Sequence, residues 1–179
     1  MPEIAIRLAT AADIPHLIEL DHSYVSDYVW QMEVQQDEEL VNVTFRQIRL
    51  PRSARVEYPR SPRLLEQDWQ DRSAVLVALL AEQPVGYISL MQHTAPLATW
   101  TTDLVVMRRL RRQGIGTALL LAAQEWAKTH GSSRLVLEMQ PKNYPAICLA
   151  QKLGFDFCGY SDRYYSNQDI ALFFARPLR

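Results

Sequence analysis

The chain has 179 residues, 48% of them hydrophobic and 22% charged, so residues 1–179 suit a single domain with one sizeable core. The formal net charge of −1 excludes a general attraction to nucleic acid or to acidic membrane surfaces, so any anion site must be local. The sequence shows no basic-then-apolar leader and no run of about 18 apolar residues, so we expect a soluble cytoplasmic protein that binds no membrane.

The first part of the chain predicts a strand followed by helices. Residues 4–8 alternate in polarity and predict a strand. Thr10, with Asp13 three residues later, matches a capping box, so a helix should run to about Leu20. We interpret residues 21–30 as a second helix with an aromatic tip.

The next segment is less regular. Residues 35–39 are polar and acidic and predict a loop, whereas residues 42–50 alternate in polarity and predict a strand. Residues 51–62 are rich in proline and arginine, and we interpret them as irregular chain at the surface. A short helix is expected over residues 64–69.

From residue 74 onward the pattern becomes sharper. A continuous apolar run at residues 74–81 predicts a buried strand, and a turn then leads to a return strand at residues 85–91. Residues 98–107 predict a further strand. A long helix follows over residues 114–129, because its apolar residues recur with the spacing of a helix that lies on a sheet.

The C-terminal part adds one helix and three strands. Residues 134–139 predict a strand, and residues 145–153 predict a helix with a proline in its first turn and a glycine as its stop. Residues 155–160 and 170–176 predict two final strands. Because hairpins and helical connections alternate along the chain, we expect a mixed sheet flanked by helices, of the α/β or α+β class.

The segment Arg111-Arg112-Gln113-Gly114-Ile115-Gly116-Thr117 joins a strong strand to the long helix. The first N–H groups of a helix are unpaired, and the helix dipole places partial positive charge there. Gly114 and Gly116 leave the backbone accessible, so successive N–H groups can surround a pyrophosphate. Arginines at positions 108, 109, 111 and 112 add local positive charge.

Other phosphate-binding loops fit this segment less well. A Walker A loop needs Gly-Lys-Ser/Thr, but Gly116 is followed by Thr117 and Ala118. A Rossmann turn needs a third glycine, and Leu119 stands in its place. The glycines by themselves leave open a plain helix start beside a solvated basic loop.

Two motifs in order carry a resemblance to a known family. Arg-x-x-Gly-x-Gly after a strand that ends Asp103-Leu104-Val105-Val106 resembles the acetyl-CoA motif of the GNAT N-acetyltransferase superfamily. The segment Leu137–Ala146, followed by Lys152-Leu153-Gly154-Phe155, resembles the second motif of that family. More narrowly, the strand at residues 42–50 and the Leu-Glu-x-Gln-x-x-Asn segment are similar to streptothricin acetyltransferases.

The resemblance implies a sheet whose central parallel strands splay apart, with acetyl-CoA as co-substrate in the gap. The backbone of Leu104, Val105 and Val106 would pair with the pantetheine arm, and an N–H near Val106 would face the thioester oxygen. Residues 111–117 would hold the diphosphate, and Asn143 would hydrogen-bond the cofactor arm. The same residues are also compatible with plain core strand positions and, for Asn143, with a helix N-cap.

Acetyl transfer to a primary amine needs a base, because an amine with a pKa of about 10.4 is mostly protonated at neutral pH. Glu138 matches the family's carboxylate position on the strand beside the cleft and is our candidate for that base. Asp103 is a candidate for binding the cationic amine. The sequence leaves open that both carboxylates are structural ion-pair partners.

One position departs from the family pattern. Many members carry a tyrosine seven residues after the asparagine as proton donor to the departing thiolate, and this chain has Ala150 there. Tyr164 is our candidate to replace it, with Tyr160 and Tyr165 as alternatives. The two cysteines and four histidines show no metal-ligand spacing, so we expect no metal.

Tyr28 and Trp30 are candidates for binding the acceptor, at the tip of the first helix pair, although they could instead cover the core or form a homodimer contact. The leading interpretation is an enzyme that moves an acetyl group from acetyl-CoA to a small-molecule or peptide amine. A non-catalytic acyl-CoA-binding module, favoured by Ala150, is the alternative. Nucleic-acid binding through the arginine-rich segments is disfavoured by the net charge.

Overall fold

The computed structural model describes residues 3–92 and 94–179, and its main feature is a seven-stranded sheet with the strand order β1-β4-β5-β6-β7-β9-β8. The sheet is mixed, as the sequence predicted, because β6 and β7 run parallel and the other described pairings are antiparallel. The strands are β1 (Ile4–Leu8), β4 (Ala74–Leu80), β5 (Gln83–Gln92), β6 (Ala98–Val106), β7 (Arg134–Met139), β8 (Asp156–Ser161) and β9 (Ala171–Pro177).

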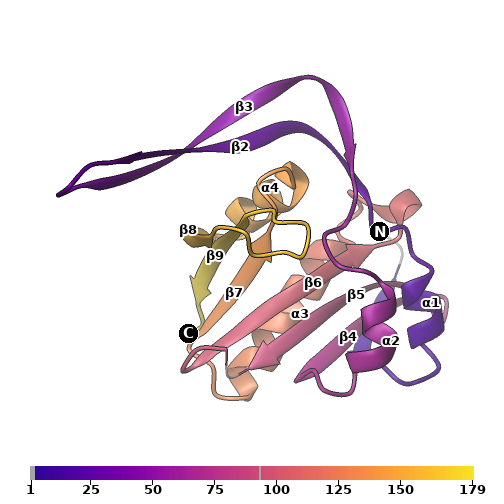
Figure 1. Ribbon diagram of the computed structural model, residues 1–179. Coiled ribbons are helices and arrows are strands. Elements are labelled where there is room, and N and C mark those ends of the chain that lie inside the picture. Colours follow the sequence, from indigo (N-terminus) through magenta and orange to yellow (C-terminus); the bar gives the residue numbers. More distant parts are fainter. Residues whose placement is uncertain (1–2, 93) are drawn as a thin grey trace.

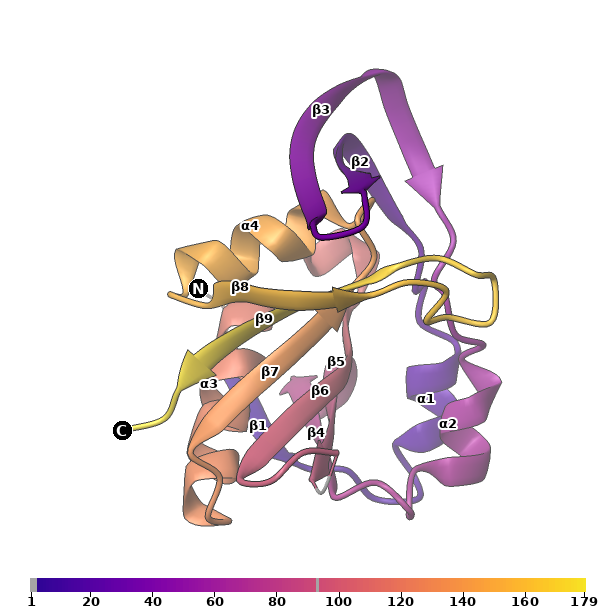
Figure 2. The same cartoon turned by 60° about the vertical axis from the view of Figure 1, so that its left-hand side comes forward.

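Helices cover both faces of this sheet (Figure 1, Figure 2). The long helix α3 (Ile115–Thr129) and the helix α4 (Tyr144–Lys152) lie on one face, and two short helices, α1 (Ile14–Ile18) and α2 (Arg63–Asp68), lie on the other. A short 3-10 turn (Arg108–Leu110) links β6 to α3. No helix that the structure describes is both long and apolar enough to cross a lipid bilayer.

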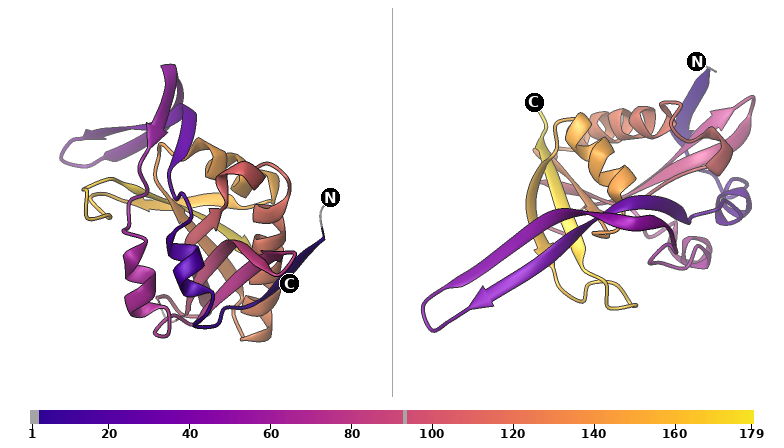
Figure 3. Two further views of the ribbon diagram at one scale, coloured as in Figure 1. Left: turned by 90° about the vertical axis from the view of Figure 1, so that its right-hand side faces the viewer. Right: turned by 90° about the horizontal axis from the view of Figure 1, so that it is seen from above.

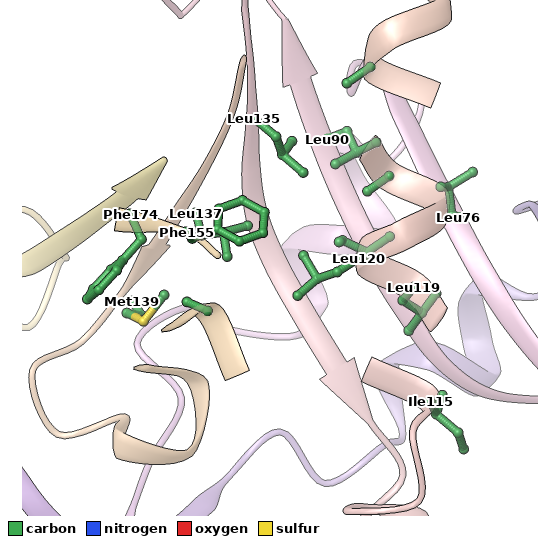
Figure 4. Close-up of a cluster of buried hydrophobic side chains, with 14 of the residues drawn as sticks. Leu76, Leu90, Ile115, Leu119, Leu120, Leu135, Leu137, Met139, Phe155 and Phe174 are labelled. Atoms are coloured by element: carbon green, nitrogen blue, oxygen red, sulfur yellow. The ribbon is translucent and has the colours of Figure 1, made fainter. Parts of the chain in front are cut away.

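The main core lies between the sheet and α3, as Figure 4 shows. The predicted apolar stripe of α3 is confirmed, because Ile115, Leu119, Leu120, Ala123 and Ala127 are all buried. Strand β4 is buried on both faces: Leu76 and Ala78 contact the α3 side, whereas Val75 and Val77 contact the cluster under α1 and α2. This double burial explains the continuous apolar run of its sequence.

Residues 24–56 form a long two-stranded hairpin that projects from the body (Figure 1, Figure 3). Its strands are β2 (Tyr24–Gln36) and β3 (Val41–Val56). The prediction of a helix over residues 21–30 is therefore wrong. Valine, tyrosine and tryptophan in that segment favour a strand, and pairing with β3 satisfies its backbone.

Strand β3 is also longer than predicted, since it continues through Pro51, which we had placed in irregular chain. A bulge explains how the strand tolerates the proline. The pairing moves from Ser26–Ala54 to Tyr28–Arg49, so Pro51 lies in the unmatched stretch, where its missing N–H costs no ladder bond.

The base of the hairpin is fixed to the body by aromatic contacts. Trp30 lies within 6.5 Å of the rings of Phe45, Phe157 and Phe174, measured between ring centroids. The backbone N–H of Trp30 also donates to the backbone carbonyl of Pro141 at 3.0 Å. The hairpin is therefore held over α4 and the β8–β9 edge, while its far end extends away from the body (Figure 3).

The first helix is shorter than predicted. The Asp13 carboxylate accepts hydrogen bonds from the Thr10 N–H at 2.7 Å and from the Thr10 hydroxyl at 3.1 Å. Of the two bonds in a capping box, the one from the backbone N–H of Thr10 to the Asp13 side chain is therefore present. Helix α1 nevertheless begins only at Ile14 and ends at Ile18. Residues 10–13 instead form a turn that delivers the chain to the helix.

Candidate active site

The two parallel strands at the centre of the sheet separate part-way along their length. Strands β6 and β7 pair from Ala98–Arg134 to Thr101–Leu137, and β6 then continues to Val106 without β7 beside it. A bulge starts this separation, because the pairing of β6 with β5 skips Thr102. Bulges bend a strand and increase its twist, so β6 turns away from β7 here. We call the resulting gap the fork.

A pocket of about 60 Å³ occupies the fork. Its apolar wall comes from α3, α4 and β7, and its polar wall comes from β6, β7 and three loops. Thr101, at the closed end of the fork, is 3% exposed, and its hydroxyl has no partner among the described residues. A buried hydroxyl without a partner costs about 1–3 kcal/mol, so it is suited to meet a ligand or a water molecule.

The glycine turn lies at the open end of the fork, where α3 begins. Gly114 is the N-cap residue, with a left-handed φ of 88°, and no side chain caps the helix. The first bond within the helix joins the Ala118 N–H to the Gly114 carbonyl at 3.0 Å. The N–H groups of Ile115, Gly116 and Thr117 therefore precede the first helical bond and point out of the helix end, as an anion site requires.

Gly116 is needed for a close approach between elements. A Cβ atom at this position would lie 3.3 Å from the Leu149 side chain of α4 and 4.0 Å from that of Val106. The glycine therefore lets the start of α3 come close to both walls of the fork. The two glycines differ in role: Gly114 permits the turn, and Gly116 permits the contact.

The backbone of β6 offers hydrogen-bonding groups to the fork. The Met107 N–H donates to the Val85 carbonyl of β5 at 2.7 Å, so the alternating groups of Val105 also face β5. The N–H and C=O groups of Leu104 and Val106 then face the opposite side, toward the fork. This is the side on which an added extended chain would pair with β6.

The side chain of Arg111 has a structural function that the sequence did not indicate. Its guanidinium donates to three backbone carbonyls, those of Val106 at 2.8 Å, Ser23 at 2.7 Å and Asp21 at 2.5 Å. In this structure the guanidinium therefore holds backbone carbonyls, and a contact of Arg111 with the diphosphate stays a prediction. Arg112 and Gln113 are exposed beside the helix start, and their phosphate contacts stay a prediction.

Glu138 lies at the fork on β7, with a fully buried side chain. One carboxylate oxygen accepts from Arg60, and the other accepts from the indole N–H of Trp100 at 2.7 Å and the Tyr164 hydroxyl at 2.6 Å. The two residues predicted as catalytic, Glu138 and Tyr164, are thus in contact. Burial and the bond to Glu138 raise the pKa of the Tyr164 phenol, which keeps its proton at neutral pH.

Asp103 lies across the fork on β6 and is 4% exposed. Its carboxylate accepts from Arg72 at 2.5 Å, from the Thr102 hydroxyl at 3.0 Å and from the Tyr58 hydroxyl, and Arg60 lies 3.8 Å away. Burial alone would raise the pKa of Asp103, but the two arginines outweigh burial and hold that pKa below its usual value. Asp103 is therefore ionised at neutral pH.

Replacing Arg72 with methionine should destabilise the protein by about 3 kcal/mol, because it leaves the buried Asp103 carboxylate short of its main cation. Urea unfolding measures this loss. Arg46→Met is the matched control, since Arg46 is 70% exposed and lies 3.6 Å from Glu33, so its removal should change stability little. Equal losses in the two variants would show that the Arg72–Asp103 pair is not the main contribution.

Two positions on α4 bear on the predicted site, Asn143 as a cofactor contact and Ala150 as the place of the missing tyrosine. Asn143 is the N-cap of α4, because its side chain accepts from the Ala146 N–H at 3.2 Å, and it also lines the pocket. Its bond to a cofactor arm stays a prediction. Ala150 is fully buried, so α4 brings no hydroxyl group from that position into the fork.

The predicted acceptor residues Tyr28 and Trp30 lie on β2 rather than at a helix tip, and neither lines the pocket in the fork. Tyr28 packs on Tyr144, with ring centroids 4.6 Å apart, and Trp30 packs in the aromatic base of the hairpin. Their positions favour the packing alternative. The sequence did not indicate a position near the fork for four polar residues, which are Tyr58, Arg60, Arg72 and Thr101.

Comparison with known proteins agrees with this architecture. The model of the acetyltransferase (GNAT) family matches residues 42–155. The chain belongs to the GNAT family. Acetyl-CoA-dependent acetyl transfer is the activity that this membership and the acetyltransferase relatives support.

Individual relatives span the length of the chain to different extents. The N-alpha-acetyltransferase of Saccharolobus solfataricus is 37% identical over 122 residues, which are 59% of this chain and 70% of that protein. The crystal structure of nourseothricin acetyltransferase has a TM-score of 0.82 at 23% identity and covers 98% of this chain and 99% of its own. A Bacillus anthracis protein assigned to the streptothricin acetyltransferases was solved with acetyl coenzyme A. Its structure has a TM-score of 0.75 at 21% identity and covers 98% of this chain and 99% of its own.

The residues in the fork fit acetyl-CoA. The glycine turn presents unpaired N–H groups, a Cβ at Gly116 would narrow the passage beside it, and the buried Thr101 hydroxyl needs a partner at the other end. The polar backbone of β6 lies between these two points. The diphosphate of acetyl-CoA can therefore meet N–H groups at the helix start, and its extended pantetheine arm can meet backbone groups along the fork.

Proposed function

We propose that this acetyltransferase moves the acetyl group directly to the amine of a small cationic acceptor, with Glu138 as the general base. The observation that carries the proposal is the position of a buried carboxylate at the fork, where the strand pairing ends. The residues predicted to bind the cofactor, from Leu104 to Val106 and from residue 111 to Thr117, would line the route from the helix mouth to that carboxylate. The backbone, rather than the side chain of Arg111, would contact the diphosphate.

Each protein group in this reaction has a stated task. The acceptor arrives as an ammonium ion, and Glu138 takes its proton. The neutral nitrogen then forms a bond to the acyl carbon while the carbon–sulfur bond breaks and the thiolate leaves. The acylated nitrogen gives its second proton to that thiolate or to water, which leaves a neutral amide. An N–H of β6, at Leu104 or Val106, stabilises the negative charge on the acyl oxygen. A thiolate leaves without full protonation because its conjugate acid has a pKa of about 8.5.

A cationic acceptor suits the surroundings of Glu138. Trp100, Tyr164 and Tyr165 lie around the carboxylate, and an ammonium group is stabilised both by a carboxylate and by aromatic faces. Asp103 would add a second negative charge across the fork. The role of Tyr164 as proton donor to the thiolate stays a prediction, because its hydroxyl donates to Glu138 in this structure.

A second cavity supports a place for the body of the acceptor. It has a volume of about 430 Å³ and lies under the hairpin, between β2, β3 and the β8–β9 loop. Gln140 lines both this cavity and the pocket in the fork. Glu57 and Asp169 place carboxylates along it. We infer that the hairpin encloses a small molecule, of the streptothricin class, rather than the alpha-amine named in the N-alpha-acetyltransferase of Saccharolobus solfataricus.

The test combines binding with turnover. Calorimetry should show binding of acetyl-CoA, and free-thiol release should appear with streptothricin, less with spermidine, and least with a peptide that has a free N-terminus. A preference for the peptide would contradict the acceptor class. Acetyl-CoA binding without turnover on any of the three amines would favour the non-catalytic module, which the buried Ala150 also favours. A cytoplasmic location and a homodimer stay predictions from the sequence.

A further inference from the structure

The guanidinium of Arg60 lies inside the fork, beside the proposed base. It donates to the Glu138 carboxylate and, at 2.9 Å, to the carbonyl of Thr102, the residue of the β6 bulge. Its carbon lies 5.1 Å from the ring centroid of Tyr165. A cation supplied by the chain itself thus sits between a carboxylate and an aromatic ring, which is where the amine of a cationic acceptor would bind.

The two carboxylates of the fork depend on Arg60 to different degrees. Asp103 has Arg72 at 2.5 Å and would stay paired if Arg60 moved away. Glu138 would keep its bonds from Trp100 and Tyr164, which are neutral donors. Departure of Arg60 would therefore leave one buried negative charge without a cation, at Glu138, and one incoming positive charge would restore neutrality.

Of the two arginines, Arg60 is the one able to move. Arg72 is 10% exposed and is bound to Asp68, Ser89 and Asp103. Arg60 is 23% exposed, and it lies in the segment 57–62, which contains no helix or strand. Its flexible stem offers a route from the fork to solvent without unfolding a regular element.

The full burial of the Glu138 side chain also requires a displacement if Glu138 is the base. One oxygen is engaged by Arg60, and the other already accepts two hydrogen bonds. An ammonium group can transfer its proton to Glu138 only from hydrogen-bonding distance. Because the guanidinium of Arg60 is itself a cation, its replacement by an ammonium group leaves the total charge in the fork unchanged.

We propose that Arg60 occupies the subsite for the acceptor's ammonium group and is displaced from Glu138 when the acceptor binds. Arg60 is then a specificity-determining residue: a monocationic group replaces it without leaving a buried charge, and a neutral group does not. This inference rests on the proposed function, since it concerns the acceptor side of the same fork.

A binding experiment tests the subsite without any turnover. In Arg60→Ala, the probe methylguanidinium should enter the subsite, so about 20 mM of its chloride should raise Tm by about 2 °C or more relative to equal sodium chloride. Wild-type protein should show no such rise, because Arg60 fills the subsite. Arg63→Ala is the control, since Arg63 is an exposed residue three positions away. No rise in Arg60→Ala would overturn the proposal.

Kinetics with saturating acetyl-CoA then test the displacement. In Arg60→Ala, the KM for streptothricin should fall about 10-fold, because the acceptor no longer competes with an internal cation. Arg60→Lys retains a competing cation and should keep a KM near that of wild type, as should Arg63→Ala. A fall in kcat without a fall in KM would show that Arg60 stays in the active site during the reaction, and would overturn the proposal that the acceptor displaces it.

The two levels of failure can be told apart. If wild-type protein turns over none of the amines, the proposed acceptor class fails, but the methylguanidinium titration still reports on the subsite. If wild-type protein is active and Arg60→Ala neither binds methylguanidinium nor gains affinity for streptothricin, Arg60 is a fixed structural ion-pair partner and the inference fails alone. Arg60→Lys keeps the kinetic test available if the alanine variant folds poorly.

Discussion

Replacing Glu138 with glutamine should lower kcat for acetyl transfer by about 10²–10⁴-fold and leave the Kd of acetyl-CoA nearly unchanged. The amide keeps the size of the carboxylate but cannot take a proton from the acceptor. Because the bonds of Glu138 are to Arg60, Trp100 and Tyr164, and none is to the glycine turn, the cofactor side of the fork should not be affected. Thiol-release rates and calorimetry measure the two effects separately.

The matched control is Glu125→Gln, which removes the same charge from the exposed surface of α3. It should leave both kcat and Kd unchanged. In Glu138→Gln the residual rate should also rise about tenfold per pH unit below the pKa of the acceptor amine, since only amine that is already neutral can react. A kcat equal to that of wild type would exclude Glu138 as the base.

The sequence was most informative where local pattern and function coincide. The apolar stripe of α3, the continuous run of β4 and the glycine stop after α4 each determine one element through short-range rules, and all are present in the structure. The fork, in contrast, was expected only from the resemblance to the GNAT family; it lies between the strand that precedes the glycine turn and the strand that carries Glu138.

The hairpin shows where short-range rules fail. Residues 21–30 carry aromatic and apolar residues at spacings compatible with a helix or a strand, and pairing with β3 decided between them. It also places Tyr28 and Trp30 on a strand, where they pack on other aromatic rings, and their contact with an acceptor stays a prediction. Tertiary contacts, rather than intrinsic propensity, fixed this segment.

Arg60 illustrates a second limit. It lies 78 residues from Glu138 in sequence, in a segment whose composition indicates only irregular surface chain. Nothing in that composition distinguishes Arg60 from the exposed arginines near it. Its contact with Glu138 arises because residues 58–60, on the way from the hairpin to α2, line the pocket in the fork, and this path is a property of the fold.

Replacing Gly114 with valine should raise the Kd of acetyl-CoA about tenfold or more. Gly114 has a φ of 88°, a conformation that costs a β-branched residue about 1–3 kcal/mol, so the turn must change shape or open. Either change misaligns the N–H groups of Ile115, Gly116 and Thr117 at the helix mouth. Calorimetric titration with acetyl-CoA measures the loss.

The far end of the same helix supplies the control, because Gly131 has nearly the same φ, 83°, and a Cβ there would meet no atom within 4 Å. Gly131→Val should therefore lower Tm to a similar degree and leave the Kd of acetyl-CoA unchanged. If both variants lose affinity equally, weaker binding follows from general instability of α3. If Gly114→Val alone loses affinity, the diphosphate is held by the backbone at the mouth of the helix, which is the role that two missing side chains permit.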